Sequence, residues 1–146
     1  MDVRELNKLI DDEKLTLETL DDAAELLEEN FYGATSDLEA GYFQVGLAEE
    51  QKTLLGCAFK NPVTGRITYF VSNTMILGER SAVHSFTRLL KPVVKHARLL
   101  GWKGVVYVDD FEHIGGTKDN CVKSRQILKS VARQAGWLFS EAKEQE

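Results

Sequence analysis

Two adjacent carboxylates, Asp109 and Asp110, end a short apolar run that begins at Val105. The run is β-branched and aromatic, which indicates a buried strand. Residues 111–114 resume the apolar pattern, so we expect a returning strand and a hairpin with both aspartates at its tip. Hard cations such as Mg²⁺ take oxygen ligands and offset repulsion between carboxylates. The pair therefore indicates either a divalent-metal site, which needs a further ligand, or a solvated turn.

A third carboxylate, Asp37, ends a brief strand candidate over residues 34–38. A glycine and two aromatic residues follow at 41–43, which suits the wall of a ligand site, although a lone Asp at a strand end is more often a cap or a turn. Neighbouring central strands would bring Asp37 to the same sheet edge as Asp109–Asp110. Three carboxylates there would repel one another unless cations bind between them, and two metals about 4 Å apart are the usual means of in-line phosphoryl transfer.

The N-terminal half predicts a helix and a hairpin. Thr19 and Asp22 form a capping box at the start of the helix, and Asn30 and Gly33 are expected to end it. Apolar runs at 54–59 and 67–71 are separated by strong turn residues at 61–65, which predicts a β-hairpin.

Two longer helices are expected in the C-terminal half. Residues 81–100 carry apolar side chains at helical spacing, and Pro92 should kink or break that helix. Residues 118–135 predict a second helix, and 137–139 predict the start of another strand. Strands interleaved with helices that pack on one face indicate an α+β fold.

The bulk properties are those of one ordinary globular domain of 146 residues. No apolar run approaches the roughly 18 residues of a membrane span, so no membrane association is expected. The N-terminus lacks a signal-peptide pattern, so we expect an intracellular setting, with cytoplasm and nucleus not distinguished. Cys57 and Cys121 fit neither a zinc motif nor a disulfide framework and are expected to be buried thiols.

The net charge of −5 is unevenly distributed. Residues 1–50 carry −12, and residues 51–78 carry three bases and no acid. Residues 79–103 carry +5, and residues 104–146 carry −1. A local basic region in an acidic chain is either a phosphate-binding surface or a solvated helix face. Its six bases are Arg80, Arg88, Lys91, Lys95, Arg98 and Lys103.

The sequence Tyr107-Val108-Asp109-Asp110 resembles the Tyr-x-Asp-Asp motif of reverse transcriptases. Four further segments resemble motifs of that family in order and spacing, so the resemblance covers essentially the whole chain. The stretch at 87–92 looks closest to retrotransposon enzymes of the LTR and DIRS-like groups. The four segments are Arg4–Lys8, Asp37–Val45, Gly78 with Ser81 and Ala82, and Gly136–Trp137 with Lys143.

The resemblance implies a reverse-transcriptase palm, an α+β fold with an antiparallel sheet packed on helices, and a partial fingers segment. It implies one domain over residues 1–146. Residues 1–33 and 46–75 would be partial fingers, and residues 34–45 and 76–146 would be palm. No thumb or ribonuclease H region is expected within the chain.

The resemblance also implies a metal site. Asp37, Asp109 and Asp110 would be catalytic residues. Together with the backbone carbonyl of Leu38 they would bind two Mg²⁺ or Mn²⁺ ions. The ions would activate the primer 3′-hydroxyl and neutralise charge on the phosphates.

Further residues are implied to contact the substrates. Tyr42 would lie under the incoming sugar and reject a 2′-hydroxyl. Gly78 would let the nucleotide or template approach the backbone closely. Lys143 would assist the leaving pyrophosphate. Tyr107 and Val108 would contact the primer terminus.

The function implied is that of an RNA-directed DNA polymerase domain, a nucleotidyltransferase from a transposable element. Its partners would be an RNA or DNA template with a primer, deoxynucleoside triphosphates, and further polymerase domains of a longer polyprotein. The chain departs from the family pattern at Ile76–Leu77, at Glu79–Arg80 and at Val83, and Glu79 would be unfavourable beside a triphosphate. Two alternatives stay open: a truncated, catalytically inactive relic that keeps the palm fold, and an unrelated α+β interaction domain whose Asp-Asp is only a turn.

Overall fold

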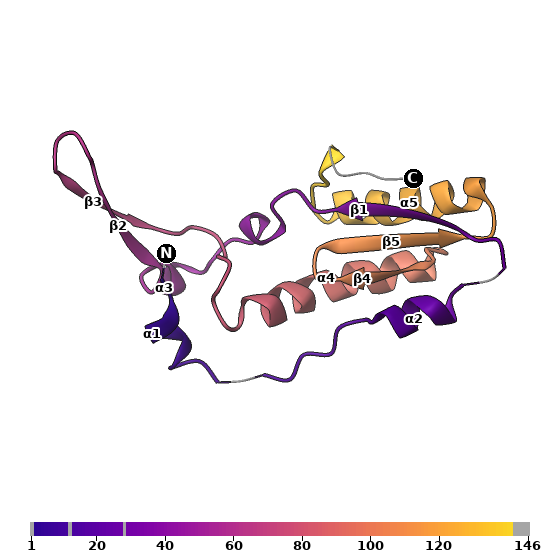
Figure 1. Cartoon of the computed structure of the whole chain (residues 1–146), viewed down its shortest axis with the longest axis horizontal. Helices are drawn as coiled ribbons and strands as arrows, with labels where there is room; N and C mark the ends of the chain where they lie inside the picture. The colour runs from indigo at the N-terminus through magenta and orange to yellow at the C-terminus, as the bar shows by residue number, and fades with distance from the viewer. Residues whose placement is uncertain (1, 12, 28, 142–146) are drawn as a thin grey trace.

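A three-stranded sheet and two long helices form the body of the molecule, and a two-stranded hairpin projects from it (Figure 1). The structure is a computed structural model that describes residues 2–11, 13–27 and 29–141. No helix within these ranges is long and apolar enough to cross a membrane.

The sheet brings together strands that are far apart in the sequence. β1 (Tyr32–Asp37), β5 (Asp110–Gly115) and β4 (Gly104–Tyr107) are antiparallel and lie in the order β1-β5-β4. The expected adjacency of the strand that carries Asp37 and the strand that carries Asp110 is therefore confirmed, but β1 lies at the edge of this sheet rather than at its centre. The expected strand at 137–139 is wrong, because that segment contributes a single bridge between Leu38 and Phe139.

Helices α4 (Ala82–Leu99) and α5 (Lys118–Gln134) pack against each other beneath the sheet. Both were expected. Of the two alternatives at Pro92, the break is wrong, because α4 is continuous through it, and the kink stays a prediction. Pro92 lies on the exposed side of α4, where a carbonyl that loses its intrahelical partner is near water. The core between the helices and the sheet includes Phe86, Leu90, Ala97, Phe111, Leu128 and Ala132, all at most 2% exposed.

The hairpin consists of β2 (Gly56–Lys60) and β3 (Ile67–Val71), in the expected position. Asn61 organises its loop, because its Oδ1 accepts hydrogen bonds from the N–H groups of Val63 and Thr64. Every residue of both strands is exposed. The expected burial of Cys57, which lies in β2, is therefore wrong, whereas Cys121 is buried in the body.

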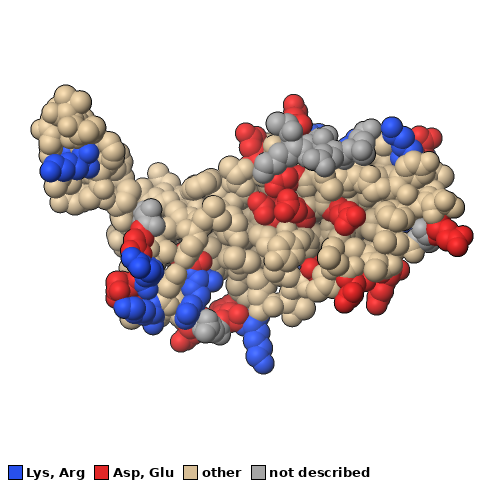
Figure 2. All heavy atoms as spheres, viewed as in Figure 1, with Lys and Arg blue, Asp and Glu red and all other residues tan. Residues whose placement is uncertain are grey.

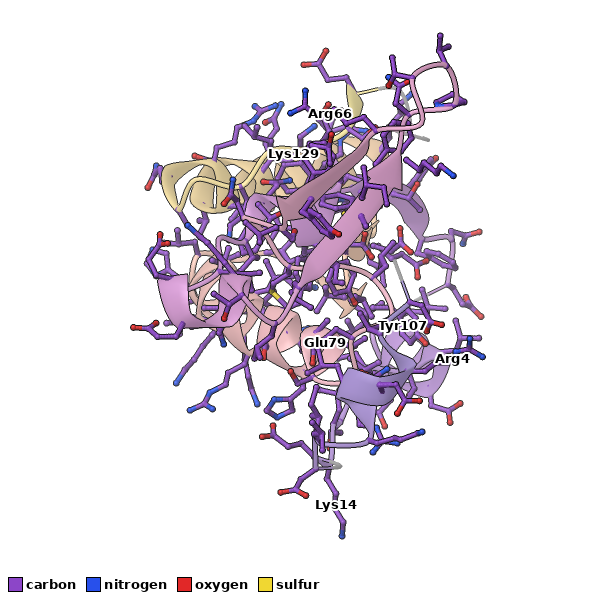
Figure 3. The ribbon with its side chains drawn as sticks, turned by 90° about the vertical axis from the view of Figure 1, so that its left-hand side faces the viewer. Arg4, Lys14, Arg66, Glu79, Tyr107 and Lys129 are labelled. Carbon is purple, nitrogen blue, oxygen red and sulfur yellow. The ribbon has the colours of Figure 1, made fainter. Side chains whose placement is uncertain are left out.

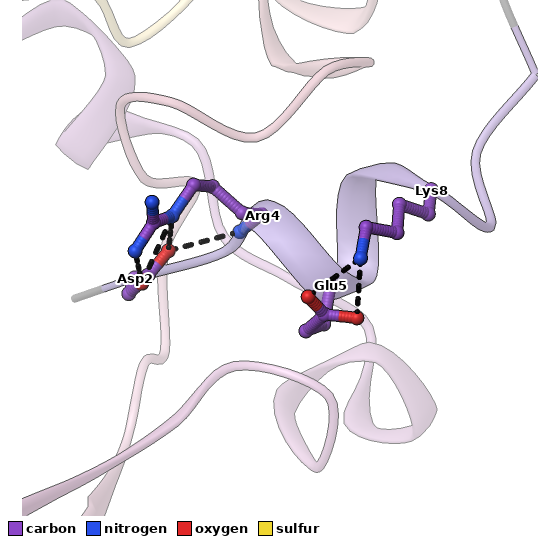
Figure 4. A network of polar contacts seen from close by, with 4 residues as sticks. All are labelled: Asp2, Arg4, Glu5 and Lys8. Carbon is purple, nitrogen blue, oxygen red and sulfur yellow. Dashed lines mark hydrogen bonds and ion pairs between the residues drawn. The ribbon is translucent and has the colours of Figure 1, made fainter.

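The N-terminal region contains short helices, of which α2 contacts β4. α1 (Arg4–Asn7) carries two exposed ion pairs, Arg4 with Asp2 and Lys8 with Glu5 (Figure 4). α2 (Leu20–Glu25) begins with the expected capping box at Thr19. The other short helical segments are η1 (Gly41–Gln44) and α3 (Glu49–Lys52).

Candidate active site

Asp37 and Asp110 are directly opposite each other in the pairing of β1 with β5. Opposed residues of an antiparallel pair point to the same face, with Cβ atoms about 5 Å apart. Both aspartates line a groove of about 870 Å³ on the sheet face away from α4 and α5. Asp37 is only 7% exposed, whereas Asp110 is open to solvent. In Figure 2 acidic side chains gather in the middle of the visible face, over the ends of these strands.

Asp109 occupies the turn between β4 and β5. Tyr107 pairs with Asp110, so the two central residues are Val108 and Asp109. We expected both aspartates at the tip of the hairpin. This is wrong by one residue, because Asp110 is already the first residue of β5. The positive φ that a two-residue turn requires falls on Val108, at +59°, which is rare for a β-branched residue. The N–H of Leu38 donates to the carbonyl of Asp109 at 3.2 Å, which ties the turn to the end of β1.

The segment after β1 packs against the same turn. A Cβ on Gly41 would lie 3.2 Å from the Cβ of Asp109 and 3.1 Å from the ring of Phe86, so this position favours glycine. The ring of Tyr42 stacks on Phe86 with centroids 4.8 Å apart, and Tyr42 is buried. Burial raises the pKa of Tyr42, and the negative charge of Asp109 raises it further. Tyr42 is therefore a fixed aromatic wall near the aspartate of the turn.

The carboxylates have the donor chemistry of a hard-cation site. Among the described residues no group of three or more His, Cys, Asp or Glu side chains is arranged to hold a metal ion. Mg²⁺, however, is usually bound through one or two carboxylates, with water and substrate phosphates completing the shell. The pair Asp37 and Asp110, with Asp109 beside it, fits that open type of site rather than an all-protein cage.

The loop before α4 is held by a side-chain amide. Asn7 donates from Nδ2 to the carbonyl of Gly78, and the N–H of Arg80 donates to Asn7 Oδ1, both at 2.8 Å. Gly78 has a φ of +93°, which favours glycine. The carboxylate of Glu79 accepts from the N–H and the hydroxyl of Ser81, at 2.9 Å and 2.7 Å. The carboxylate expected to disturb a triphosphate pocket is thus engaged at the start of α4.

Glu18 supports the strand that leads to the turn, and no local sequence signal singles it out. Its Oε2 accepts from the N–H of Val106 at 2.9 Å, and its carboxylate pairs with Arg98 at 2.7 Å. Arg98 also donates to the carbonyl of Gly104 at 3.1 Å. Glu18 and Arg98 together bind backbone groups on the outer edge of β4, where the described part of the chain places no neighbouring strand.

A buried histidine lies on the opposite, helix-facing side of the sheet. The indole N–H of Trp102 donates to Nδ1 of His113 at 3.0 Å, so Nε2 carries the proton that His113 donates to Ser36 Oγ at 2.7 Å. Burial, aided by the charges of Arg125 and Lys129, lowers the pKa of His113 to about 3. His113 is therefore neutral and links β5 to the residue that precedes Asp37.

The structure thus brings together Asp37, Leu38, Tyr42 and the Asp109–Asp110 pair. Tyr107 is 60% exposed and lines the groove beside Asp37. Lys143 lies outside the described residues.

The fold is similar to solved reverse transcriptases, although neither a protein-family model nor a curated protein matches the sequence. Native prototype foamy virus protease-reverse transcriptase has a TM-score of 0.75 and 21% identity, over 99% of this chain and 18% of that one. The foamy viral enzyme dRH in complex with double-stranded DNA has a TM-score of 0.77 and 20% identity, over 98% of this chain and 24% of that one. A complex of the foamy viral enzyme with an RNA/DNA hybrid has a TM-score of 0.61 and 21% identity, over 77% of this chain and 14% of that one.

These solved chains are much longer than this one, which spans less than a quarter of each. The expected fold class, an antiparallel sheet packed on helices in an α+β arrangement, is confirmed. The described chain has a reverse-transcriptase-like fold.

Proposed function

We propose that this chain is the palm region, with part of the fingers, of an RNA-directed DNA polymerase that adds deoxynucleotides to a primer 3′-hydroxyl. The observation that supports it most is the placement of Asp37 opposite Asp110, with Asp109 on a turn bonded to Leu38. A solvated turn needs no such partner from a distant strand. The alternative of an unrelated domain is also disfavoured by the likeness of fold.

The carboxylates would hold the metal ions in this proposal. Asp37, Asp109 and the carbonyl of Leu38 would bind two Mg²⁺ or Mn²⁺ ions, and Asp110 would complete the carboxylate cluster. When bound, such ions lower the pKa of the attacking hydroxyl and neutralise charge on the transferred and leaving phosphates. The burial of Asp37 and the backbone bond at Asp109 limit how far either group moves as substrate binds.

Other residues would select and orient the substrates. Tyr42 is held by its stacking on Phe86, so its ring would exclude a sugar that carries a 2′-hydroxyl. Gly78 has no side chain to obstruct a nucleotide or template. Tyr107 and Val108 would contact the primer terminus, and Lys143 would assist the leaving pyrophosphate. The substrates would be an RNA or DNA template, a primer and deoxynucleoside triphosphates, and a retrotransposon polyprotein would be the source.

A second candidate is an inactive relic that keeps this fold. It is favoured by the departures from the family pattern at Ile76–Leu77 and Glu79–Arg80. This candidate retains the aspartates and their repulsion but lacks turnover. Activity and metal binding therefore have to be measured separately.

Primer extension tests the proposal directly. The chain is incubated with an RNA template, an annealed DNA primer, deoxynucleotides and Mg²⁺ or Mn²⁺. Asp109→Asn is the test variant, and Asp11→Asn, an exposed aspartate outside the helices and strands, is the matched control. Extension that is lost only in Asp109→Asn supports the polymerase. Extension that is equal in all three proteins would exclude the assigned site.

Metal-dependent thermal stabilisation tests the metal site, and together with primer extension it separates the relic from the polymerase. In both cases Asp109→Ala should raise the melting temperature without metal, because it relieves carboxylate repulsion, and should abolish stabilisation by Mn²⁺. Asp11→Ala should change neither quantity. An unchanged metal response in Asp109→Ala would reject the metal site, and a normal response without primer extension would favour the relic.

A further inference from the structure

The outer face of α4 carries a row of basic side chains. Arg88, Lys91 and Lys95 are exposed and are spaced three and four residues apart, so they lie along one side of the helix. The row spans about 10 Å at 1.5 Å per residue. The proposed metal site uses none of these side chains.

These bases line a groove of about 610 Å³ between α4 and the extended segment 14–18. Lys14 lies on the opposite wall and reaches outward from that segment (Figure 3). Val108, the neighbour of Asp109 in the turn, also lines the groove, so the groove extends from the turn along α4. Its apolar lining includes Leu15, Leu17, Leu90, Val94 and Val106.

The positive charge of the groove has little compensation. Among the described residues Glu18 is the carboxylate that lines it, and Glu18 is already engaged by Arg98 and the backbone of Val106. Glu13, which precedes Lys14, pairs with His84 of the same groove. Within the described ranges, no carboxylate forms an ion pair with Lys14 or with the three bases of the α4 row. A groove with unpaired, positively charged side chains on both walls attracts an extended polyanion.

We propose that this groove binds the phosphate backbone of one nucleic-acid strand as the strand leaves the Asp109 turn. The proposal rests on the proposed function, because the continuity of the groove with the turn is what favours nucleic acid over an acidic peptide. The basic side chains lie on both walls of the groove, so they can contact the phosphates of one strand from two sides. Binding through phosphates requires no sequence preference.

The test is fluorescence anisotropy with a labelled single-stranded DNA oligonucleotide, without metal and over a range of salt concentrations. Lys91→Glu/Lys95→Glu is compared with Lys60→Glu/Arg66→Glu, which makes the same charge change at exposed bases of the hairpin and its loop. Each lost phosphate contact lowers the slope of log K against log salt by about 0.7 for single strands. We expect the α4 variant to lose about 1.4 from the slope and at least about tenfold in affinity.

The hairpin variant should keep the slope and affinity of the unmodified chain. Equal losses in both variants would show general charge attraction and would overturn the proposal, as would no loss in the α4 variant. Binding of an acidic peptide that depends on Lys91 and Lys95, without oligonucleotide binding, would overturn it as well. Lys91→Gln/Lys95→Gln removes the charges without adding repulsion, and it should give the same loss of slope if the contacts are direct.

Binding in the groove and binding of metal can be lost independently. Asp109→Asn should lose the Mn²⁺ response but keep the salt slope, because the groove does not use that carboxylate. A retained metal response without groove binding rejects the groove alone. Groove binding without a metal response rejects the metal site alone.

Discussion

The body and the β2–β3 hairpin are built from similar residues but are stabilised very differently. In the body, aromatic side chains such as Phe86 and Phe111 are at most 1% exposed. In the hairpin, Tyr69 is 78% exposed and Phe59 is 56% exposed, and no layer of the described chain covers either strand (Figure 1). Because an isolated two-stranded hairpin is only marginally stable, the free energy of unfolding resides in the body.

The largest expected effect is at the centre of the body. Phe86→Ala should lower the free energy of unfolding by about 3–5 kcal/mol, the usual cost of removing a buried aromatic ring. Phe86 is fully buried and contacts both Tyr42, at 4.8 Å, and Trp137, at 5.4 Å, between ring centroids. Urea denaturation measures the loss. A loss below about 1 kcal/mol would mean that the core does not hold the body together.

A pair of adjacent glycines tests how tightly the body is packed. A Cβ on Gly115 would lie 2.3 Å from the backbone N of Cys121, whereas one on Gly116 would meet nothing within 4 Å. Gly115→Ala should therefore destabilise by about 1–3 kcal/mol, because the strand and α5 must move apart. Gly116→Ala should stay within about 0.5 kcal/mol in the same urea titration. Equal effects would contradict the close contact between β5 and α5.

Lowering the pH should decrease the free energy of unfolding, because His113 is held neutral in the folded chain. Its pKa is lowered from 6.5 to about 3 in the folded chain, so the unfolded chain binds the proton more readily between these values. Stability from this residue is present above pH 6.5 and is lost as the pH falls below it, by about 1 kcal/mol between pH 6.5 and roughly 5.5. His113→Gln should remove this part of the pH dependence in thermal melts. An identical pH profile in the variant would exclude the assignment.

The smallest effect is expected in the hairpin. Tyr69→Ala removes a ring that is 78% exposed, so the free energy of unfolding should change by no more than about 0.5 kcal/mol. The measurement is again urea denaturation, beside Phe86→Ala. A loss comparable to that of Phe86→Ala would show that the hairpin is packed in solution, and the contrast between the two regions would disappear.

Elements specified by local interactions were predictable from the sequence. The helices at 81–100 and 118–135, the hairpin and the capping box at Thr19 are all present. Two predictions failed because the length of an element depends on its tertiary contacts. α2 ends at Glu25 rather than near Asn30, because among its residues only Ala23 is buried and packing does not extend it. The segment 137–139 forms a bridge, since only its contact with Leu38 provides pairing.

The candidate site was predictable in its residues but less so in its geometry. The adjacency of Asp37 to the Asp-Asp segment followed from the expected sheet. The turn was misplaced by one residue, because the pairing of β4 with β5 puts Val108, and not Asp110, at its centre. Glu18 carries no recognisable pattern, since its partner, the N–H of Val106, is 88 residues away in the sequence. Arg98 was recognisable only as one base of the basic region, and that pattern does not predict its bond to the carbonyl of Gly104.

The sequence by itself determined the α+β class, the two long helices and the carboxylates worth testing. It did so because helical periodicity, capping and turn chemistry act between residues a few positions apart. Only the tertiary structure decided that Asp37 faces Asp110, that Tyr42 is locked against Phe86, that His113 is neutral and that the bases of α4 line a groove. Those features depend on burial and on contacts between distant segments, which exist only once the sheet has formed on its helices.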